Sequence, residues 1–273
     1  MNKIIFKQRL SENVVRIDVI APVIATRAMA GQFVVLRVND TGERIPLTIY
    51  SATETPGAIA LIFQEVGATT KMLGALNAGD FIADIVGPLG RPATIASYDT
   101  VIVIGGGVGI AEALPVASAL RKAGNRVIGI TGARTKGLVI LEAEMKAACD
   151  EVFVTTDDGT YGKKGFVTEQ LQELLAKKIS VGMIYAVGPV AMMRSVANLT
   201  KSYGIKTLVS LNPIMLDGTG MCGVCRCTIE GKTKFACVDG PEFDAHQVDW
   251  AELIARQSSF KTKEKESLER FHR

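Results

Sequence analysis

The chain has 273 residues, which is enough for about two domains of roughly 150 residues each. Hydrophobic residues make up 48% and charged residues 22%, so the composition is that of a folded globular protein and excludes global disorder. A net charge of +3 and an aromatic content of 6% provide neither the basic surface nor the stacking rings that nucleic-acid binding requires.

No segment of the sequence suggests export or a membrane. Residues 1–12 lack the apolar core and cleavage site of a signal peptide. Residues 101–120 are the most apolar stretch, but they contain several glycines, a glutamate and a proline, so they would span a membrane poorly. We therefore expect a cytoplasmic protein without membrane contact. Four of its five cysteines lie within residues 222–237, which in the cytosol indicates metal rather than disulfides.

Residues 1–97 are expected to form a small antiparallel β-barrel. Short apolar runs rich in β-branched residues alternate with Gly and Pro, and one helix is expected over residues 69–76. The predicted strands cover residues 13–23, 32–38, 47–50, 58–66 and 81–86.

Residues 98–211 change to apolar strands that alternate with amphipathic helices, which predicts a parallel, doubly wound sheet. The strands are expected at residues 101–104, 126–131, 151–155, 183–187 and 207–211, and the helices at 110–123, 142–149, 166–176 and 190–203.

Two further segments follow the expected sheet. Residues 212–245 hold the cysteine cluster and little regular structure, and residues 246–273 combine a short helix at 249–256 with a charged tail from residue 261. The expected fold class is therefore α/β plus β, with a barrel, a nucleotide domain and a C-terminal metal segment. The two histidines, His246 and His272, are expected to be exposed and outside any site.

A glycine loop follows the first strand of the expected sheet and precedes a helix. Glycine lets a phosphate approach the backbone, and the helix N-terminus offers unpaired N–H groups, so this context predicts dinucleotide binding. Ile110 replaces the third glycine of the usual motif, and a turn that merely packs strand against helix is the alternative. The residues of the loop are Gly105, Gly106, Gly107, Val108 and Gly109.

The ends of the other expected strands strengthen this prediction. Arg134 follows the second strand, Asp157 and Asp158 end the third, and Gly188 and Pro189 follow the fourth. Because the carboxyl ends of parallel strands share one edge of the sheet, we expect these residues to line one nucleotide crevice. Arg134 could pair with the 2′-phosphate of NADP(H), and it stands where an acidic ribose ligand is usual.

Two segments of the expected barrel could hold a second nucleotide. Arg44 and Thr48 put a guanidinium and a hydroxyl on one strand, and Gly67, Thr69 and Thr70 begin the expected helix. Arginine binds phosphate in a bidentate manner, and a helix start receives phosphate through backbone N–H groups. Each segment alone is equally typical of a surface arginine or a helix-capping threonine.

Taken together, these segments resemble the ferredoxin–NADP reductase superfamily. The similar motifs are residues 44–48, residues 67–70, Gly-Pro-Leu-Gly at 87–90, the glycine loop and Gly-Pro-x-x-Met at 188–192. The resemblance implies FAD on the barrel and a nicotinamide nucleotide, NAD(H) with NADP(H) possible, on the α/β domain.

The same resemblance implies roles for single residues. Pro46, Leu47 and Thr48 would lie along the flavin ring, and Arg44, Gly67 and Thr70 would lie at the FAD phosphates. Hydride would pass between the flavin side at Thr48 and the nicotinamide side at Gly188. The sequence departs from the family pattern at three positions: Leu47 replaces a common Tyr, Glu112 a common Pro, and Val187 a frequent Cys.

The cysteine cluster permits two kinds of metal site. Cys222, Cys225, Cys227 and Cys237 could form a structural zinc site, although the close C-x-C is unlike a zinc ribbon. Counted from Asp217, the spacing x4, x2 and x11 repeats that of [2Fe–2S] ligands, with Asp in the first place and Cys227 left over. A group of unliganded core thiols is a third alternative.

Residues 211–227 and 235–243 closely resemble the small subunits of NADH-dependent reduced ferredoxin:NADP+ oxidoreductases, also described as sulfide dehydrogenase flavoprotein subunits. The resemblance implies that Asp217, Cys222, Cys225 and Cys237 hold a [2Fe–2S] cluster. The electron-transfer subunit of dihydroorotate dehydrogenase is a close relative that usually has Cys in place of Asp217. The implied partner in a heterodimer is a larger flavoprotein subunit with [4Fe–4S] clusters, related to the glutamate synthase small subunit.

The expected function is electron transfer. Nicotinamide moves two electrons as hydride, a cluster accepts one at a time, and FAD can do both. The resemblance implies electron bifurcation, with ferredoxin served through the complex. The alternatives are an electron-transfer subunit for dihydroorotate or for sulfide and polysulfide, and, in another class, a nucleotide-binding regulatory module stabilised by zinc.

Overall fold

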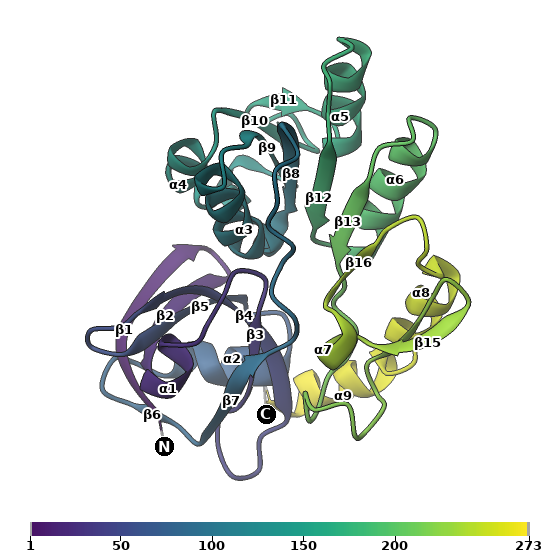
Figure 1. Cartoon of the computed structure of the whole chain (residues 1–273). Coiled ribbons are helices and arrows are strands. Elements are labelled where there is room, and N and C mark those ends of the chain that lie inside the picture. The colour runs from purple at the N-terminus through teal and green to yellow at the C-terminus, as the bar shows by residue number, and fades with distance from the viewer. Residues whose placement is uncertain (1, 272–273) are drawn as a thin grey trace. The chain divides into compact units, whose positions relative to one another are not determined.

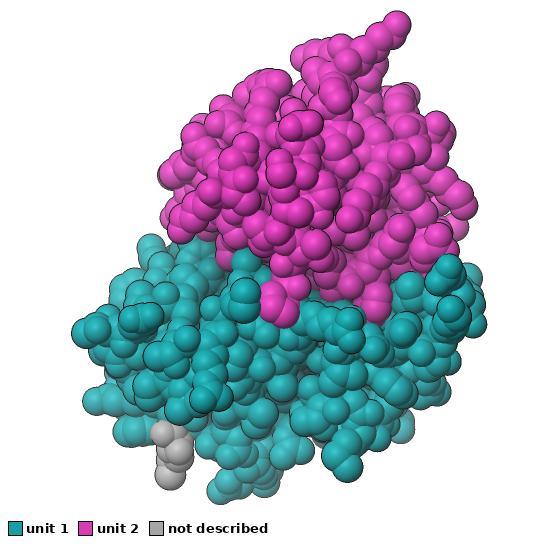
Figure 2. Space-filling model, in the orientation of Figure 1, with its two compact units in different colours: residues 1–91, 212–241, 249–273 teal, residues 92–211, 242–248 magenta. Residues whose placement is uncertain are grey.

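The computed structural model describes residues 2–271, which divide into two compact units (Figure 2). The first unit contains the described residues up to Arg91, Asn212–Pro241 and those from Asp249 onward. The second contains Pro92–Leu211 and Glu242–Val248. The expected boundary at residue 97 therefore differs from the break at 91, and the expected cluster segment is shared between the units. Its division into functional domains stays a prediction.

The first unit is built around the expected antiparallel barrel, a seven-stranded sheet in the order β6-β1-β2-β5-β4-β3-β7 (Figure 1). Its core alternates along the strands, so that Val34 and Leu36 of β3 point inward with Ile49 of β4. The strands and helices are β1 (Asn2–Ser11), β2 (Val14–Ile20), α1 (Pro22–Ala25), β3 (Phe33–Arg37), β4 (Arg44–Thr53), β5 (Ala58–Gln64), α2 (Ala68–Ala75), β6 (Phe81–Ile82) and β7 (Asp84–Leu89).

The second unit is the expected doubly wound sheet, in the order β11-β10-β9-β8-β12-β13-β16. All pairs are parallel except β13 with β16, and the sequence analysis did not predict β11 or β16. The elements are β8 (Thr100–Gly106), α3 (Ile110–Lys122), β9 (Arg126–Ala133), α4 (Glu142–Ala148), β10 (Glu151–Thr156), β11 (Lys163–Lys164), α5 (Val167–Ala176), β12 (Met183–Val187), α6 (Val190–Lys201), β13 (Thr207–Ser210) and β16 (Glu242–Asp244).

The cysteine segment and the C-terminus have more regular structure than expected. A hairpin of β14 (Arg226–Ile229) and β15 (Lys232–Phe235) precedes α7 (Ala236–Asp239). The predicted short helix is α8 (Trp250–Ser258), whose N-cap Asp249 accepts a hydrogen bond from the backbone N–H of Glu252. The expected charged tail is a helix, α9 (Lys261–Phe271), which packs against α2. Residues 272 and 273, and so His272, lie outside the described residues.

In the part of the chain that the structure describes, none of the helices combines the length and the apolar character needed to cross a bilayer.

Candidate functional site

The expected glycine loop joins the end of β8 to the start of α3. Three of its glycines have ordinary φ values but no room for a side chain. A Cβ atom at Gly105 would lie 2.5 Å from Ile110 Cδ1, and one at Gly106 would lie 2.4 Å from Met192 Sδ. A Cβ at Gly109 would lie 2.6 Å from the carbonyl oxygen of Val187. The loop thus packs against the end of β12, as the packing alternative predicted.

Gly107 is different from the other glycines of this loop. Its φ is +56°, and no atom lies within 4 Å of the position that its Cβ would take. Its backbone is therefore open to a phosphate at the start of α3, while its neighbours hold the loop against β12. The loop can therefore pack closely and still leave room for a phosphate, because Gly105, Gly106 and Gly109 are in close contact with neighbours and Gly107 is open.

The structure brings the other predicted nucleotide residues to the same edge of the sheet. β8, β9, β10 and β12 run parallel, so Arg134, Asp157 and Gly188 follow strands that end together. The backbone N–H of Asp158 donates to the carbonyl of Arg134 at 3.2 Å, which joins the two loops. The backbone N–H and the hydroxyl of Thr160 both donate to the Asp158 carboxylate and hold its pKa below the ordinary value.

A buried polar cluster that the sequence analysis missed lies beneath this loop. The hydroxyl of Tyr185 on β12 is 3.3 Å from Glu112 Oε1 in the first turn of α3, and Ser210 on β13 also contacts this hydroxyl. Burial, followed by the charges of Glu112 and Glu242, raises the pKa of Tyr185 well above its usual value. Glu242 on β16 accepts hydrogen bonds from the hydroxyl and backbone N–H of Thr94, and burial raises its pKa. The signal available in the sequence was Glu112, a charged residue in an apolar stretch.

His246 corrects the expectation that both histidines are exposed. Its side chain is only 18% exposed, and its Nε2 lies 3.0 Å from the hydroxyl of Thr200 on α6. The hydroxyl of Thr207 on β13 donates to Thr200 in turn. His246 therefore anchors the residues after β16 to the second unit.

In the first unit, β4 separates the predicted flavin residues onto two faces. Leu47 and Ile45 pack against the barrel core, so Arg44, Pro46 and Thr48 alternate to the outer face. Leu47 therefore faces away from any flavin that lies on the outside of this strand. The residues directly before and after Leu47, Pro46 and Thr48, have the outward orientation that the resemblance implied for all three.

Arg44 lies at the beginning of β4, at the edge of a cavity of about 370 Å³. Arg37, directly opposite on β3, also lines this cavity, and its Nε donates to Asp84 at 2.7 Å. Among the described residues Arg44 has no ion-pair or hydrogen-bond partner. Its guanidinium is therefore available to an anionic ligand.

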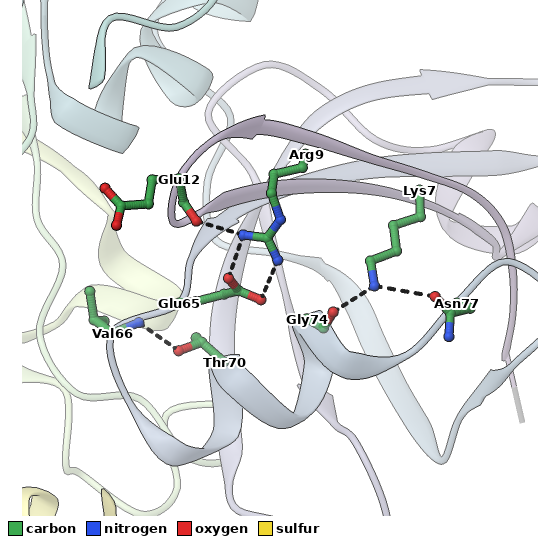
Figure 3. A network of polar contacts seen from close by, with 8 residues as sticks. All are labelled: Lys7, Arg9, Glu12, Glu65, Val66, Thr70, Gly74 and Asn77. Atoms are coloured by element: carbon green, nitrogen blue, oxygen red, sulfur yellow. Dashed lines mark hydrogen bonds and ion pairs between the residues drawn. The ribbon is translucent and has the colours of Figure 1, made fainter. Parts of the chain in front are cut away.

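The start of α2 has the geometry of a helix N-terminus with a polar turn (Figure 3). The Thr70 hydroxyl accepts hydrogen bonds from the backbone N–H groups of Val66 and Gly67, at 3.1 and 3.0 Å. No atom lies within 4 Å of the position of a Cβ at Gly67, so a ligand can approach this backbone. Thr69 is only 5% exposed and belongs to the buried side of the helix.

Next to this turn, Figure 3 shows Glu65 turned toward Arg9 of β1. The two side chains form a bidentate ion pair, with the closer N···O distance at 2.8 Å. Arg9 also donates to the carbonyl of Glu12. This network fixes the chain that enters α2, so that the backbone at Gly67 is presented from a supported turn.

The predicted metal ligands lie together in the first unit as two pairs. The backbone N–H of Cys222 donates to Asp217 Oδ2 at 2.7 Å, and the Cys222 thiol also contacts this carboxylate. Cys225 Sγ and Cys237 Sγ are 3.2 Å apart. The backbone N–H groups of Thr219 and Cys222 hold the pKa of Asp217 below its ordinary value. Asp217 is thus an oxygen donor beside the sulfur donor Cys222, and Cys225 and Cys237 form a separate pair of sulfur donors.

Two pairs fit a two-iron cluster, which takes two protein ligands on each iron. In residues 2–271, no three His, Cys, Asp or Glu side chains are spaced to surround a single metal ion, as tetrahedral zinc requires. Cys227 belongs to neither pair. It is 1% exposed, its Sγ lies 3.7 Å from the Lys234 carbonyl oxygen, and burial raises the pKa of its thiol to about 12.

Two family models match parts of this chain. Residues 103–198 match the family model of an oxidoreductase NAD-binding domain. Residues 212–249 match the iron–sulfur cluster binding domain of dihydroorotate dehydrogenase B. The second match overturns the zinc alternative for the cysteine segment.

Three similar proteins extend the comparison to the whole chain. An electron-transfer subunit homologue of dihydroorotate dehydrogenase B (NAD+) from Thermotoga maritima is 44% identical and aligns over 99% of this chain and 95% of its own length. A solved structure of NADH-dependent reduced ferredoxin–NADP oxidoreductase, studied for flavin-based electron bifurcation, is 42% identical, with a TM-score of 0.95 over 100% of this chain and 98% of that one. The ferredoxin reductase of carbazole 1,9a-dioxygenase, 18% identical with a TM-score of 0.63 over 75% and 64% of the two chains, shares the fold.

These findings confirm the fold class, the oxidoreductase activity and the cofactor types predicted from the sequence. The barrel has the FAD-binding fold of ferredoxin reductases, the parallel sheet is an NAD(H) domain, and the cysteine segment is an iron–sulfur domain. The chain is therefore an NAD(H)-dependent oxidoreductase subunit for electron transfer. It belongs to the family formed by the electron-transfer subunits of dihydroorotate dehydrogenase B and their homologues.

Proposed function

We propose that this chain exchanges hydride with NAD(H) on FAD and exchanges single electrons, through a [2Fe–2S] cluster, with a larger flavoprotein subunit in a bifurcating complex. The observation that carries the proposal is the adjacency of the two cofactor sites within one compact unit. Val35 of β3 pairs with Pro46 of β4. The loop of residues 217–225, called the cluster loop below, contacts Val35 at Gly218. The outer face of β4 therefore lies one strand away from the cluster loop.

The residues of the barrel would bind and orient FAD. FAD supplies the exchange between one hydride and two single electrons. Arg44 and the open backbone at Gly67 are available to its phosphates, while Thr70 supports that turn. Pro46 and Thr48 face outward on β4, and the Thr48 hydroxyl would hydrogen-bond at the ring. The Leu47 side chain packs against the core, so Leu47 would meet the ring through its backbone alone.

The residues of the parallel sheet would bind the nicotinamide nucleotide. Gly107 would receive its phosphates at the start of α3, with the rest of the glycine loop holding the backbone there. Arg134, Asp157 and Asp158 would lie at the ribose, and Gly188 with Pro189 at the nicotinamide. We propose NADH as the preferred partner nucleotide, because the relatives of this chain are named for NAD(+) and because Asp157 and Asp158 add negative charge to the sheet edge that Arg134 shares.

The four residues in two pairs, Asp217, Cys222, Cys225 and Cys237, would hold the cluster. Asp217 favours the bifurcating family over the dihydroorotate alternative, whose electron-transfer subunits usually have Cys at this position. The name of the Thermotoga relative supports the alternative, and the similar oxidoreductase structure supports the bifurcating reading. The proposed partner carries [4Fe–4S] clusters and serves ferredoxin, in the cytoplasm, where the five free cysteines would stay reduced.

Anaerobic purification from the native host tests the proposal. We expect a larger iron–sulfur flavoprotein to co-purify, and the chain to show flavin and [2Fe–2S] spectra. NADH should bleach the flavin faster than NADPH in a stopped-flow measurement. Oxidation of NADPH coupled to reduction of both NAD+ and ferredoxin supports bifurcation, whereas reduction by dihydroorotate with an orotate-forming partner would establish the alternative.

A binding variant tests the FAD site directly. Arg44→Ala should retain FAD less well on gel filtration, because a phosphate loses its guanidinium partner. Arg27→Ala, at an exposed position of the same unit, is the matched control and should retain FAD as wild type does. Equal FAD affinity in the two variants would remove Arg44 from the site.

A further inference from the structure

The outer face of β3 has an apolar cover that comes from the cluster loop. Val34 and Leu36 point into the barrel core, so Val35 between them points outward, yet it is only 2% exposed. A Cβ atom at Gly218 would lie 3.1 Å from Val35 Cγ2 and 2.5 Å from Leu89 Cδ1 of β7. The backbone at Gly218 therefore rests directly on these two barrel side chains.

The contact at Gly218 lies close to β4, the strand proposed to bind the flavin. β3 lies between β4 and β7 in the sheet. Phe33 pairs with Thr48 on one side and with Leu89 on the other, and Val35 pairs with Pro46. Since neighbouring strands are about 4.8 Å apart, the contact of Gly218 is one strand spacing from the outward residues of β4.

Gly218 is also next to the first proposed cluster ligand. It directly follows Asp217, and its φ of +74° lies in the left-handed region that favours glycine. A contact between the cluster loop and the barrel is thus made by the residue that directly follows the first proposed cluster ligand. A side chain at this position would meet Val35 and Leu89, so the loop that carries Asp217 or these barrel side chains would have to shift.

We propose that Gly218 is a positioning residue that seats the cluster loop on Val35 and Leu89 and thereby sets the rate of electron transfer from flavin to cluster. The inference rests on the proposed function and deepens it. To reach an ordinary carbon–carbon contact of about 3.5–4.0 Å, a Cβ at Gly218 and Leu89 Cδ1 must separate by at least about 1 Å, and we propose that the loop takes up part of this displacement. Electron transfer through protein slows steeply with distance, so this displacement lowers the rate.

The test is Gly218→Ala in the full complex, with stopped-flow absorbance and freeze-quench electron paramagnetic resonance after mixing with NADH. We expect the flavin to be reduced at the wild-type rate and the cluster to be reduced several-fold more slowly. The magnetic interaction between flavin semiquinone and reduced cluster should weaken as well. This readout reports separation and does not depend on turnover.

The matched control is Gly231→Ala in the turn between β14 and β15. Gly231 has a φ of +70°, but no atom lies within 4 Å of its Cβ position. Its alanine variant carries the same backbone strain without displacing the loop from the barrel. We expect its electron transfer to match wild type. Slowing equal to that of Gly218→Ala would show that strain alone is responsible and would overturn the proposal.

A double variant keeps the test decisive if Gly218→Ala loses its cluster. Leu89→Ala removes the side chain that meets the new Cβ most closely, so Leu89→Ala/Gly218→Ala should recover the cluster and much of the transfer rate. If neither the cluster nor the transfer rate recovered, the proposed contact of Gly218 with Leu89 would be contradicted. An unchanged cluster-reduction rate in Gly218→Ala would also contradict it while leaving the proposed function intact. Failure of NADH to reduce the flavin of wild type would instead refute the proposed function.

Discussion

Two loops of this protein are rich in glycine for opposite physical reasons. In the nucleotide loop, Gly106 and Gly109 have ordinary negative φ values, and neighbouring atoms occupy the space of a side chain. In the cluster loop, Gly218, Gly220 and Gly223 all have φ between +65° and +85°. Lack of space constrains most glycines of the first loop, whereas backbone conformation constrains all three of the second, where Gly218 is closely packed as well. Glycine content alone therefore does not show which constraint applies.

The two loops also differ in what lies beneath them. The nucleotide loop leads into α3, whose first turn is tied by Glu112 to the fully buried Tyr185. The cluster loop lies at the surface of the first unit, where Cys222 is exposed and Met221 is 89% exposed. The nucleotide loop is thus supported by a buried interior, and the cluster loop by its own backbone and by one contact surface on the barrel.

The largest expected effect is a loss of stability at a glycine of the nucleotide loop that has no room for a side chain, compared with a glycine that has room but a left-handed backbone. Gly109→Ala places a Cβ against the backbone of Val187 and Gly188, which cannot rotate away, so we expect a loss of about 3 kcal/mol in the free energy of unfolding. Flavin reduction by NADH should be lost with it. Gly107→Ala meets open space and only left-handed strain, for which we expect about 1 kcal/mol. Denaturant unfolding of both variants measures the difference; equal losses would contradict the comparison.

The second prediction concerns the buried support of the nucleotide loop. Tyr185→Phe removes the hydroxyl that Glu112 and Ser210 contact, so both side chains lose a hydrogen-bond partner. We therefore expect a loss of about 1–2 kcal/mol in the free energy of unfolding. Tyr203→Phe, at a position that is 46% exposed, is the control and should unfold as wild type does. Identical denaturation midpoints for the two variants would show that the cluster of polar groups does not stabilise the sheet.

The third prediction concerns the ligands of the cluster loop. Asp217→Cys replaces an oxygen donor by sulfur, so it should retain a [2Fe–2S] cluster with a shifted resonance signal and potential. Cys227→Ser should leave both nearly unchanged, because Cys227 faces the Lys234 carbonyl and belongs to neither ligand pair. Iron content and reduced-state spectra check the two variants. Cluster loss in Cys227→Ser with an unaltered signal in Asp217→Cys would exchange their roles.

The smallest expected effect is a dependence of stability on pH. Burial raises the pKa of Glu242 in the folded chain, so its contribution to stability is complete below the ordinary carboxyl pKa and is lost as pH rises through the raised value. Glu242→Gln should flatten the pH profile of the unfolding free energy across this window. Glu144→Gln, at an exposed position of the same unit, is the control. A slope that both variants share with wild type would contradict the assignment.

The strands and helices of the second unit were predicted from the sequence more accurately than those of the first unit. Its central strands are buried on both faces, so they read as continuous apolar runs. β1 was missed because Ile4 is its one buried residue and the rest of the strand alternates irregularly. α9 was missed because most of its residues are charged and none of its described residues is buried.

The parts of the candidate site that come from residues near one another in the sequence could be predicted. The glycine loop and the spacing from Asp217 needed only local patterns. The polar cluster of Glu112, Tyr185 and Glu242 could not be predicted, because its members come from α3, β12 and β16 and meet only through strand pairing. The orientation of Leu47 was available from alternation along β4, and the family resemblance obscured it.

The chain enters and leaves the second unit twice, at residues 91/92, 211/212, 241/242 and 248/249. During synthesis the strands of the barrel are complete at Leu89, long before residues 217–237 leave the ribosome, because domains fold as their residues emerge. In that interval Val35 and Leu89 lack the loop that later covers them. Cluster insertion is therefore a late step on a nascent protein, and a chain interrupted after Leu211 would present a bare apolar strand to chaperones and proteases.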